Sequence, residues 1–310
     1  MKRFKAIACV LAVAMIAGIF AGCSKTTTIS TDKFAKACEK LKLDEMDFEK
    51  DEPDYDDIED GFYAVADEDM VEDSANEMKY LLELFGLSDV IDSRDIKSLA
   101  FAAKCDGYED LVCIGDPEEL IDMKVDGAFA LQVELDDNYV VDFMDFAEDI
   151  LDQYDISTSN LSNKEFYSSK NDGYIRFHID VAKFAKVILD NDDIMDLVDM
   201  AYDTDDFENI CNKVKGDLAI SIEINGSNIF IIGGGALNTK ASTLGSFTSA
   251  FGAVNNPVKV PYNGKVVEQI VDDAIDNYGY LLGSVAGSGA SYDDYGDYDF
   301  DDIDFDDWDT

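Results

Sequence analysis

The clearest structural signal in the chain is the run Leu218-Ala219-Ile220-Ser221-Ile222-Glu223-Ile224-Asn225-Gly226-Ser227-Asn228-Ile229-Phe230-Ile231. Its first half places a large apolar residue at every second position, which is the period of a β-strand with one buried face. Asn225-Gly226 can accept the positive φ angles of a type I′ turn, so the run predicts a hairpin that pairs Ile222 with Ile229 and Ile220 with Ile231. The apolar face of this hairpin must be covered by other parts of the chain.

A comparison of the chain with itself indicates that this hairpin belongs to the second of two similar units. Short matches keep their order along the chain: Phe34-Ala35 with Phe146-Ala147, Asp60-Gly61 with Asp172-Gly173, and Leu99, Phe101 and Val112 with Leu218, Ile220 and Ile231. They predict two copies of a helix, a strand, a helix and a hairpin. In the first copy the hairpin would turn at Asp106-Gly107, with Lys104 opposite Glu109 and with Val112 and Ile114 pointing inward.

Other segments show the period of a helix or of a strand. Apolar spacing predicts a first helix that Thr31 or Asp32 could cap. It predicts further helices at 139–154, from Val181 to Ile188 after an Asp180 cap, from Ile194 to Ala201 and from Val266 to Tyr278. Alternation predicts one strand from Ala128 to Leu135 and another after Gly173. The second strand would have Arg176 and His178 on its polar side. The predicted fold class is α+β, an antiparallel sheet with helices on one face.

The start of the chain has the parts of an export signal. Three cations within Met1–Lys5 precede an uncharged run from Ala6 to Gly22, which is short for a membrane span. Phe20-Ala21-Gly22-Cys23 resembles the signal of bacterial lipoproteins, although leucine is usual where Phe20 stands. In that family a peptidase cuts before a cysteine that carries a diacylglycerol thioether. The resemblance implies that Cys23 is the lipid attachment site and that acyl chains such as palmitate hold the protein on the outer face of the cytoplasmic membrane.

These features divide the chain into five parts. They are a signal peptide at 1–22, a lipid anchor and tether at 23–31, a first α+β unit at 32–136, a second unit with its closing helix at 137–282, and a linker with an acidic and aromatic tail at 283–310. Because glycine, serine and aspartate dominate the last part, we expect it to be flexible and disordered. The anchor and repeat layout resemble uncharacterised acidic lipoproteins of Gram-positive bacteria.

The charge balance limits the partners that this chain can bind. It has 24 Lys and Arg against 68 Asp and Glu, a formal net charge of −44. This charge argues against nucleic acids and other polyanions, and favours basic protein or peptide surfaces or divalent cations. Lysines cluster just after the anchor and would attract anionic lipid headgroups, unless they only form a solvated helix face: Lys25, Lys33, Lys36, Lys40 and Lys42.

None of the patterns that resemble a catalytic or metal site is complete. Asp56–Gly61 begins like a calcium loop, but Ile58 occupies a ligand position, and the recurrence of Asp-Gly at Asp172-Gly173 favours a shared turn. Gly233–Lys240 lacks the second glycine of a phosphate loop and is also interpreted as a turn. His178 is the only histidine, and no nucleophile with a local signature accompanies it. Catalytic residues, cofactors and metals are therefore not predicted.

Four further cysteines remain after Cys9 and Cys23 are set aside: Cys38, Cys105, Cys113 and Cys211. Their spacing does not fit a zinc site, and the predicted register points Cys105 and Cys113 to opposite faces, so we expect buried free thiols. The function indicated is that of a lipid-anchored, extracytoplasmic protein that binds a partner or associates with the envelope without catalysis. The alternative is a transporter's solute-binding lipoprotein, or a wall-modifying hydrolase, with a cleft between the two units.

Overall fold

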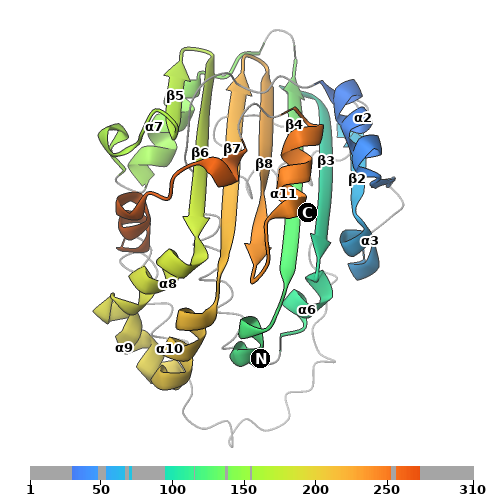
Figure 1. Ribbon diagram of the computed structural model, residues 1–310. Helices are drawn as coiled ribbons and strands as arrows, with labels where there is room; N and C mark the ends of the chain where they lie inside the picture. The colour runs from blue at the N-terminus through green and yellow to red at the C-terminus, as the bar shows by residue number, and fades with distance from the viewer. Residues whose placement is uncertain are drawn as a thin grey trace, which may run out of the picture.

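The fold centres on one eight-stranded sheet (Figure 1). The computed structural model describes residues 30–47, 54–66, 70–71, 95–114, 116–136, 139–153, 156–252 and 256–272. The strands follow the order β1-β2-β3-β4-β8-β7-β6-β5, and every neighbouring pair is antiparallel except β1 with β2. The coarse prediction of an α+β fold with antiparallel strands is therefore confirmed.

The strands differ greatly in length, and the long ones lie at the centre of the sheet. Their bounds are β1 Asp44–Glu45, β2 Phe62–Ala66, β3 Ile96–Asp106, β4 Val125–Leu135, β5 Phe166–Ser169, β6 Asp172–Asp180, β7 Gly216–Asn225 and β8 Asn228–Leu237. The predicted strands after Gly173 and at Ala128–Leu135 correspond to β6 and β4. The two units predicted from the sequence meet at the β4–β8 ladder, which runs from the Val125–Leu237 pair to the Glu134–Asn228 pair. A single sheet thus continues across that boundary.

The β7–β8 hairpin forms, but its turn lies one residue later than predicted. Ile222 pairs with Ile231 and Ile224 with Ile229, while Gly226, at φ 63°, enters the turn. The predicted partners Ile222 and Ile229 are therefore wrong by two residues. Side chains that are two residues apart on a strand point to the same face of the sheet. A shift of two residues therefore leaves the same isoleucines on one buried face.

The predicted hairpin at Asp106-Gly107 is wrong. Gly107 has φ 80° and begins the short helix α6 (Tyr108–Val112), and the 3₁₀ turn η2 (Pro117–Ile121) follows. Strand β3 pairs with β4, so Lys104 lies opposite Ala128 and not opposite Glu109. The long alternation of β4 offers β3 a full-length partner, and Val112 is left exposed instead of turning inward.

The helices begin and end close to most of the predicted positions. Their bounds are α2 Thr31–Leu41, α3 Tyr55–Asp60, α7 Phe143–Gln153, α8 Val181–Leu189, α9 Asp192–Ala201, α10 Thr204–Lys213 and α11 Ser242–Ala250, with short 3₁₀ turns η3 Thr158–Asn160 and η4 Pro257–Lys259 and a further helical stretch at 264–272. Asp180 caps α8 as predicted, since its carboxylate accepts a hydrogen bond from the Lys183 N–H at 3.1 Å. Ser30, and neither Thr31 nor Asp32, occupies the cap position of α2.

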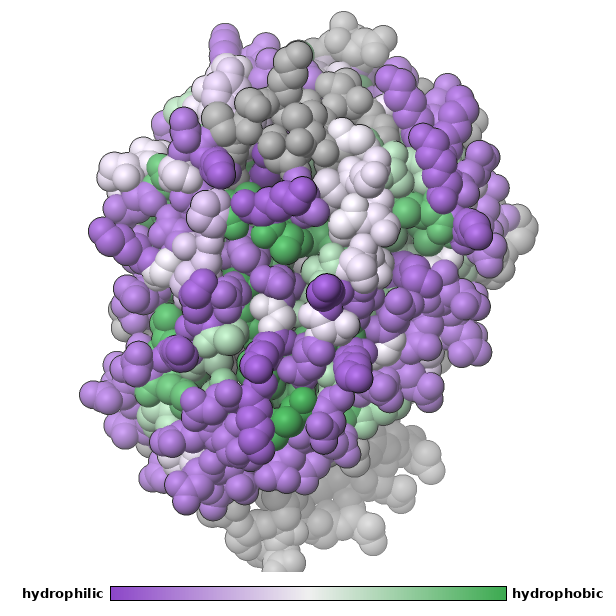
Figure 2. Space-filling view, viewed as in Figure 1, coloured by the Kyte–Doolittle hydropathy of each residue, from purple (hydrophilic) through white to green (hydrophobic). Residues whose placement is uncertain are grey.

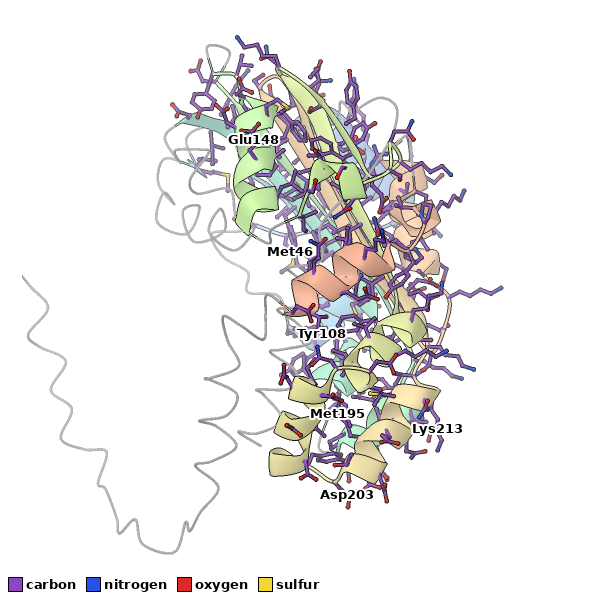
Figure 3. All side chains as sticks on the ribbon, turned by 90° about the vertical axis from the view of Figure 1, so that its left-hand side faces the viewer. Met46, Tyr108, Glu148, Met195, Asp203 and Lys213 are labelled. Atoms are coloured by element: carbon purple, nitrogen blue, oxygen red, sulfur yellow. The ribbon has the colours of Figure 1, made fainter. Side chains whose placement is uncertain are left out.

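Helices cover both faces of the sheet, so the prediction of helices on one face is wrong. We call one side the aliphatic face; its sheet residues include Leu131, Val133, Ile175, Ile222 and Ile231, which pack with α7 and 264–272. We call the other the alanine face; it includes Ala100, Ala102, Ala130, Phe230 and Ile232, which pack with α2 and α11. Figure 3 shows the sheet nearly edge-on, with α7 and its Glu148 on one side.

The two matched helices α2 and α7 lie on opposite faces of the sheet, so these two segments do not occupy equivalent places in the fold. Among the residues that the structure describes, no helix is long and apolar enough to cross a membrane. The predicted signal peptide, the anchor at Cys23, the tail and the end of the last helix lie outside the described residues.

Candidate functional site

A fully buried ion pair lies on the alanine face of the sheet. Arg176 of β6 donates from Nη2 to Glu223 Oε1 at 2.5 Å and from Nε to Ser221 Oγ at 2.8 Å. Ser221 Oγ also donates to Glu223 Oε1 at 3.1 Å. The side chains of Arg176 and Glu223 are 1% and 0% exposed. Strand register explains the contact, since Arg176 lies directly opposite Ser221 on β7, and Glu223 lies two pairs further along on the same face of the sheet.

Two tyrosines extend this network toward the edge of the sheet. The Arg176 guanidinium carbon lies 4.4 Å from the centre of the Tyr174 ring, and Tyr174 stacks on Tyr167 of β5 at 5.4 Å between ring centres. Removing a charge from water costs several kcal/mol, which only close partners offset. Because the guanidinium already has a carboxylate, a hydroxyl and a ring as partners, the network joins β5, β6 and β7 and is closed to an external ligand.

His178 fastens the segment after α11 to the edge of the sheet. Its Nδ1 lies 2.8 Å from the Val260 carbonyl oxygen, and its Nε2 lies 2.8 Å from Asp217 Oδ1. Both ring nitrogens are therefore engaged by oxygen atoms of the same chain. With both nitrogens engaged, the ring serves as a clamp and lacks the free nitrogen that a general base needs.

The glycine-rich segment that resembles a phosphate loop is part of a strand, so its interpretation as a turn is wrong. Gly233, Gly234 and Gly235 lie within β8, and a Cβ on Gly234 would come within 2.2 Å of the Gly127 carbonyl oxygen on β4. Only glycine permits strands this close at that end of the sheet.

The N-terminus of α11, which follows this strand, already binds a carboxylate of the same chain. Asp126 on β4 accepts from the N–H groups of Ser242 at 3.2 Å and Thr243 at 3.1 Å, and from Ser242 Oγ at 2.5 Å. A helix N-terminus attracts anions because its first N–H groups lack intrahelical partners. Asp126 satisfies these donors and is itself buried.

The stretch that resembles a calcium loop is helical. Asp56–Asp60 lie in α3, whose first turn is closed by reciprocal hydrogen bonds between Asp54 and Asp57. Gly61 ends α3 at φ 93°, whereas Gly173 lies inside β6 under the Phe143 ring, so the two Asp-Gly pairs do not form a shared turn. Among the described residues no three His, Cys, Asp or Glu side chains gather as metal ligands would.

The four cysteines in the described part of the chain are free thiols. Burial raises the pKa of Cys38 to about 12, and burial together with nearby carboxylates raises the pKa of Cys105 and of Cys211 to about 11. The expectation of buried thiols is confirmed for Cys38 alone, because Cys105 and Cys211 are only partly buried and Cys113 is exposed just after α6. The predicted attachment residue Cys23 lies outside the described residues.

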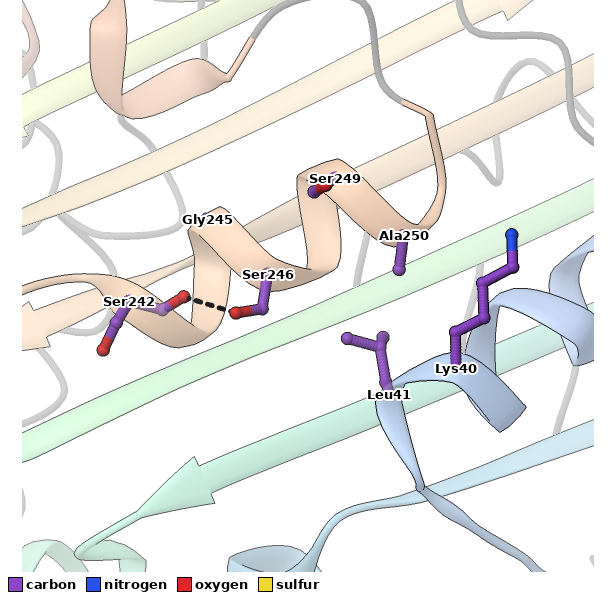
Figure 4. A pocket seen from close by; sticks show the side chains of 7 residues that line it. All are labelled: Lys40, Leu41, Ser242, Gly245, Ser246, Ser249 and Ala250. Carbon is purple, nitrogen blue, oxygen red and sulfur yellow. Dashed lines mark hydrogen bonds between the residues drawn. The ribbon is translucent and has the colours of Figure 1, made fainter.

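A shallow pocket opens between the end of α2 and the outer side of α11 (Figure 4). Lys40 and Leu41 contribute one wall, and the other consists of the small residues Ser242, Gly245, Ser246, Ser249 and Ala250. Ser246 Oγ donates to the Ser242 carbonyl oxygen at 3.0 Å, so that hydroxyl is engaged by its own helix. The pocket offers one cation and lacks a buried polar group to orient a small molecule.

Comparisons with known proteins add no functional assignment. No family model matches the chain, and neither the curated proteins nor the solved structures include a match. Function must therefore be argued from the chain itself.

Proposed function

We propose that this chain is a lipid-anchored, extracytoplasmic protein that binds basic protein or peptide surfaces and does not catalyse a reaction. The order of parts around Cys23 carries the proposal: a cationic start, an apolar run, and Phe20-Ala21-Gly22 directly before the cysteine. This order is typical of a lipoprotein signal. Two or more acyl chains make an anchor stable, whereas one chain binds only marginally.

The charge of the chain supports the choice of partner. A net charge of −44 repels anionic lipids and wall polymers, and it accelerates encounters with cationic surfaces in a manner that salt weakens. Figure 2 shows a face on which hydrophilic residues dominate, including those of α2, whereas α11 has intermediate hydropathy and small apolar areas lie between the two helices.

The described fold gives little support to a catalytic or solute-binding role. The best candidates for chemistry, Arg176, His178 and Asp126, are all engaged by partners within the chain. A cleft between two units, which a solute-binding protein or a hydrolase would need, has no room where β4 pairs with β8 along its whole length. A binding protein needs neither feature, because it can use its outer surface.

The anchor is tested by mass spectrometry of the protein purified from membranes of cells that express it. We expect the N-terminal peptide to begin at a diacylated Cys23, and Cys23→Ala protein to lose the lipid and leave the membrane fraction. Cys9→Ala is the matched control, because it removes a cysteine from the same apolar run and should keep the lipid. Native protein in the cytosol that retains Met1 would overturn the proposal.

A further inference from the structure

Exposed apolar side chains gather on two short helices at one edge of the molecule. Among the described residues the large hydrophobic side chains that are most exposed are Tyr55, Leu111, Val112, Val140 and Tyr167. Three of these five belong to α3 and α6, which pack against each other. Single exposed apolar residues are normal on a protein surface, whereas a cluster often marks an interaction site.

The geometry of α6 places its apolar residues together. Tyr108, Leu111 and Val112 are related by steps of three and four positions, which share one side of a helix. The Tyr108 ring packs against Tyr55 of α3 with ring centres 5.9 Å apart. We call Tyr55, Tyr108, Leu111 and Val112 the α3–α6 patch. The exposed fractions of Tyr55, Val112 and Leu111 are 51%, 44% and 39%.

Backbone and side-chain contacts hold the patch in place. The Glu109 N–H donates to Glu59 Oε1 at 3.3 Å, which ties the start of α6 to α3. Lys104 of β3 donates to the carbonyl oxygens of Glu59 and Asp60 at 3.0 and 3.3 Å, and its ammonium group lies 3.3 Å from Asp106. These contacts fix the two helices on β3, so the apolar side chains are presented from a supported surface.

Most of the other residues of α3 and α6 are carboxylates. Those on α3 and at its cap are Asp54, Asp56, Asp57, Glu59 and Asp60, and those on α6 are Glu109 and Asp110. The nearby cation Lys104 is already engaged by carbonyl oxygens and by Asp106. The patch therefore has an apolar centre and an acidic rim.

We propose that the α3–α6 patch binds a basic amphipathic segment of a partner protein. Apolar side chains of the segment would pack on Tyr55, Tyr108, Leu111 and Val112, and its lysines or arginines would face the carboxylates of α3 and α6. Amphipathic helices are recognised in this way by apolar surfaces of opposite charge. Other occupants are disfavoured by charge, because the tail at 292–310 has aspartates and no Lys or Arg, and a second copy of the chain also has a net charge of −44.

The inference rests on the binding part of the proposed function and is independent of the anchor. The probe is a fluorescent amphipathic helical peptide of lysine and leucine, titrated into the full-length protein and followed by anisotropy. We expect binding that weakens as salt rises. A peptide in which glutamate replaces lysine should not bind. Because this assay does not require lipid at Cys23, failure of the anchor would leave its outcome unchanged.

Matched double variants distinguish peptide binding at the α3–α6 patch from nonspecific attraction by the net charge of the protein. Leu111→Ser with Val112→Ser should weaken peptide binding by about tenfold or more, because a few apolar anchors carry most of the affinity of an interface. Val140→Ser with Tyr167→Ser removes apolar side chains of similar exposure elsewhere and should change the affinity by less than about twofold. Tyr55→Ser serves as a second patch variant in case the double variant does not fold.

A second pair of variants tests the acidic rim. Glu109→Gln with Asp110→Asn should weaken binding and reduce its salt dependence, whereas Asp192→Asn with Asp193→Asn, at the equivalent first turn of α9, should do neither. If the wild-type protein does not bind the peptide, or if patch and control variants weaken binding equally, the proposed site is wrong and the attraction is nonspecific.

Discussion

The two faces of the sheet are buried by different means. The aliphatic face uses large side chains such as Ile222, Ile231 and Val133, and α7 and 264–272 cover it. The alanine face combines small residues with buried polar groups, including Arg176 and Glu223. Alternation in the sequence separates large from small or polar residues, and it does not separate buried from exposed ones when both faces are covered.

This difference predicts how each face responds to change. On the aliphatic face, truncation of a side chain costs the lost apolar burial and a cavity. On the alanine face, small residues let α2 and α11 approach the strands closely, and each polar group depends on a specific partner. Loss of one partner leaves the other group unsatisfied in a dry environment. The alanine face should therefore be the more sensitive to single polar substitutions.

The largest effect is expected when one member of the buried ion pair is removed. Glu223→Ala leaves the Arg176 guanidinium buried without its carboxylate, which should lower the free energy of unfolding by about 3–5 kcal/mol. Urea unfolding followed by circular dichroism measures the change. Glu208→Ala, which removes an exposed glutamate of α10, should change stability by less than about 0.5 kcal/mol.

A double replacement sharpens that test. Arg176→Met with Glu223→Leu removes both charges and fills the space with apolar atoms, so it should be closer to wild type than Glu223→Ala is. A double variant that is less stable than Glu223→Ala would show that the charges themselves stabilise the fold.

Thiol labelling compares how well each face of the sheet is protected from solvent. Cys38 on α2 lies in the core of the alanine face. Cys105 of β3 points to the aliphatic side, because side chains alternate along the strand and Ala100 and Ala102 are on the alanine face, and it lies against Gly127 of β4. Because their pKa values are raised to about 12 and about 11, their thiolate fractions near neutral pH are very small. In a chain with Cys9→Ala and Cys23→Ala, we expect iodoacetamide to modify exposed Cys113 first and Cys38 and Cys105 at least about a hundredfold more slowly.

Mass spectrometry of digests taken over time gives each labelling rate. Labelling in urea is the control, since all four thiols should then react at similar rates. Rapid labelling of Cys38 in the native protein, with Cys105 still protected, would indicate that α2 opens from the alanine face while the aliphatic side stays closed.

A smaller loss of stability is expected where Asp126 of the alanine face caps α11. Asp126→Ala removes the acceptor for two N–H groups and one hydroxyl, so unfolding should become easier by about 1–2 kcal/mol. Asp116→Ala is the matched control, because Asp116 caps only the short turn η2 and is exposed. Equal losses in the two variants, measured by urea unfolding, would show that anchoring of α11 by Asp126 adds nothing to an ordinary cap.

The sequence predictions were accurate where local residues determine the structure and failed where distant contacts do. The β7–β8 hairpin and the Asp180 cap of α8 could be predicted because local residues determine them. The helix at Tyr108 could not, because Gly107 suits a hairpin turn and a helix start equally well. The helices that cover the alanine face could not be predicted either. The alanine, serine and glutamate residues that alternate with large apolar residues there have the same pattern as a strand face exposed to solvent.

The candidate sites depended even more on distant contacts. The Arg176 contacts require the β6–β7 register, and the His178 clamp requires Val260, which lies far along the chain. The α3–α6 patch was hidden because Leu111 and Val112 were assigned to a strand. Cys23 could be proposed from neighbouring residues alone, since the resemblance to a lipoprotein signal rests on consecutive residues.

The smallest expected effect lies at the rim of the alanine face, where Asp180 is partly exposed. Burial acts to raise the Asp180 pKa, but the hydrogen bonds and charge of Lys183 outweigh it, and the pKa lies below its ordinary value of 3.8. A carboxylate with a lowered pKa stabilises the fold above its unfolded pKa, and this contribution is lost as pH falls through the folded value. Asp180→Asn should therefore cost less than about 1 kcal/mol at neutral pH, because solvent screens the pair. Urea unfolding of both proteins should show this difference shrink below pH of about 4. A difference that stayed constant with pH would assign the effect to the cap of α8 and not to the charge of Asp180.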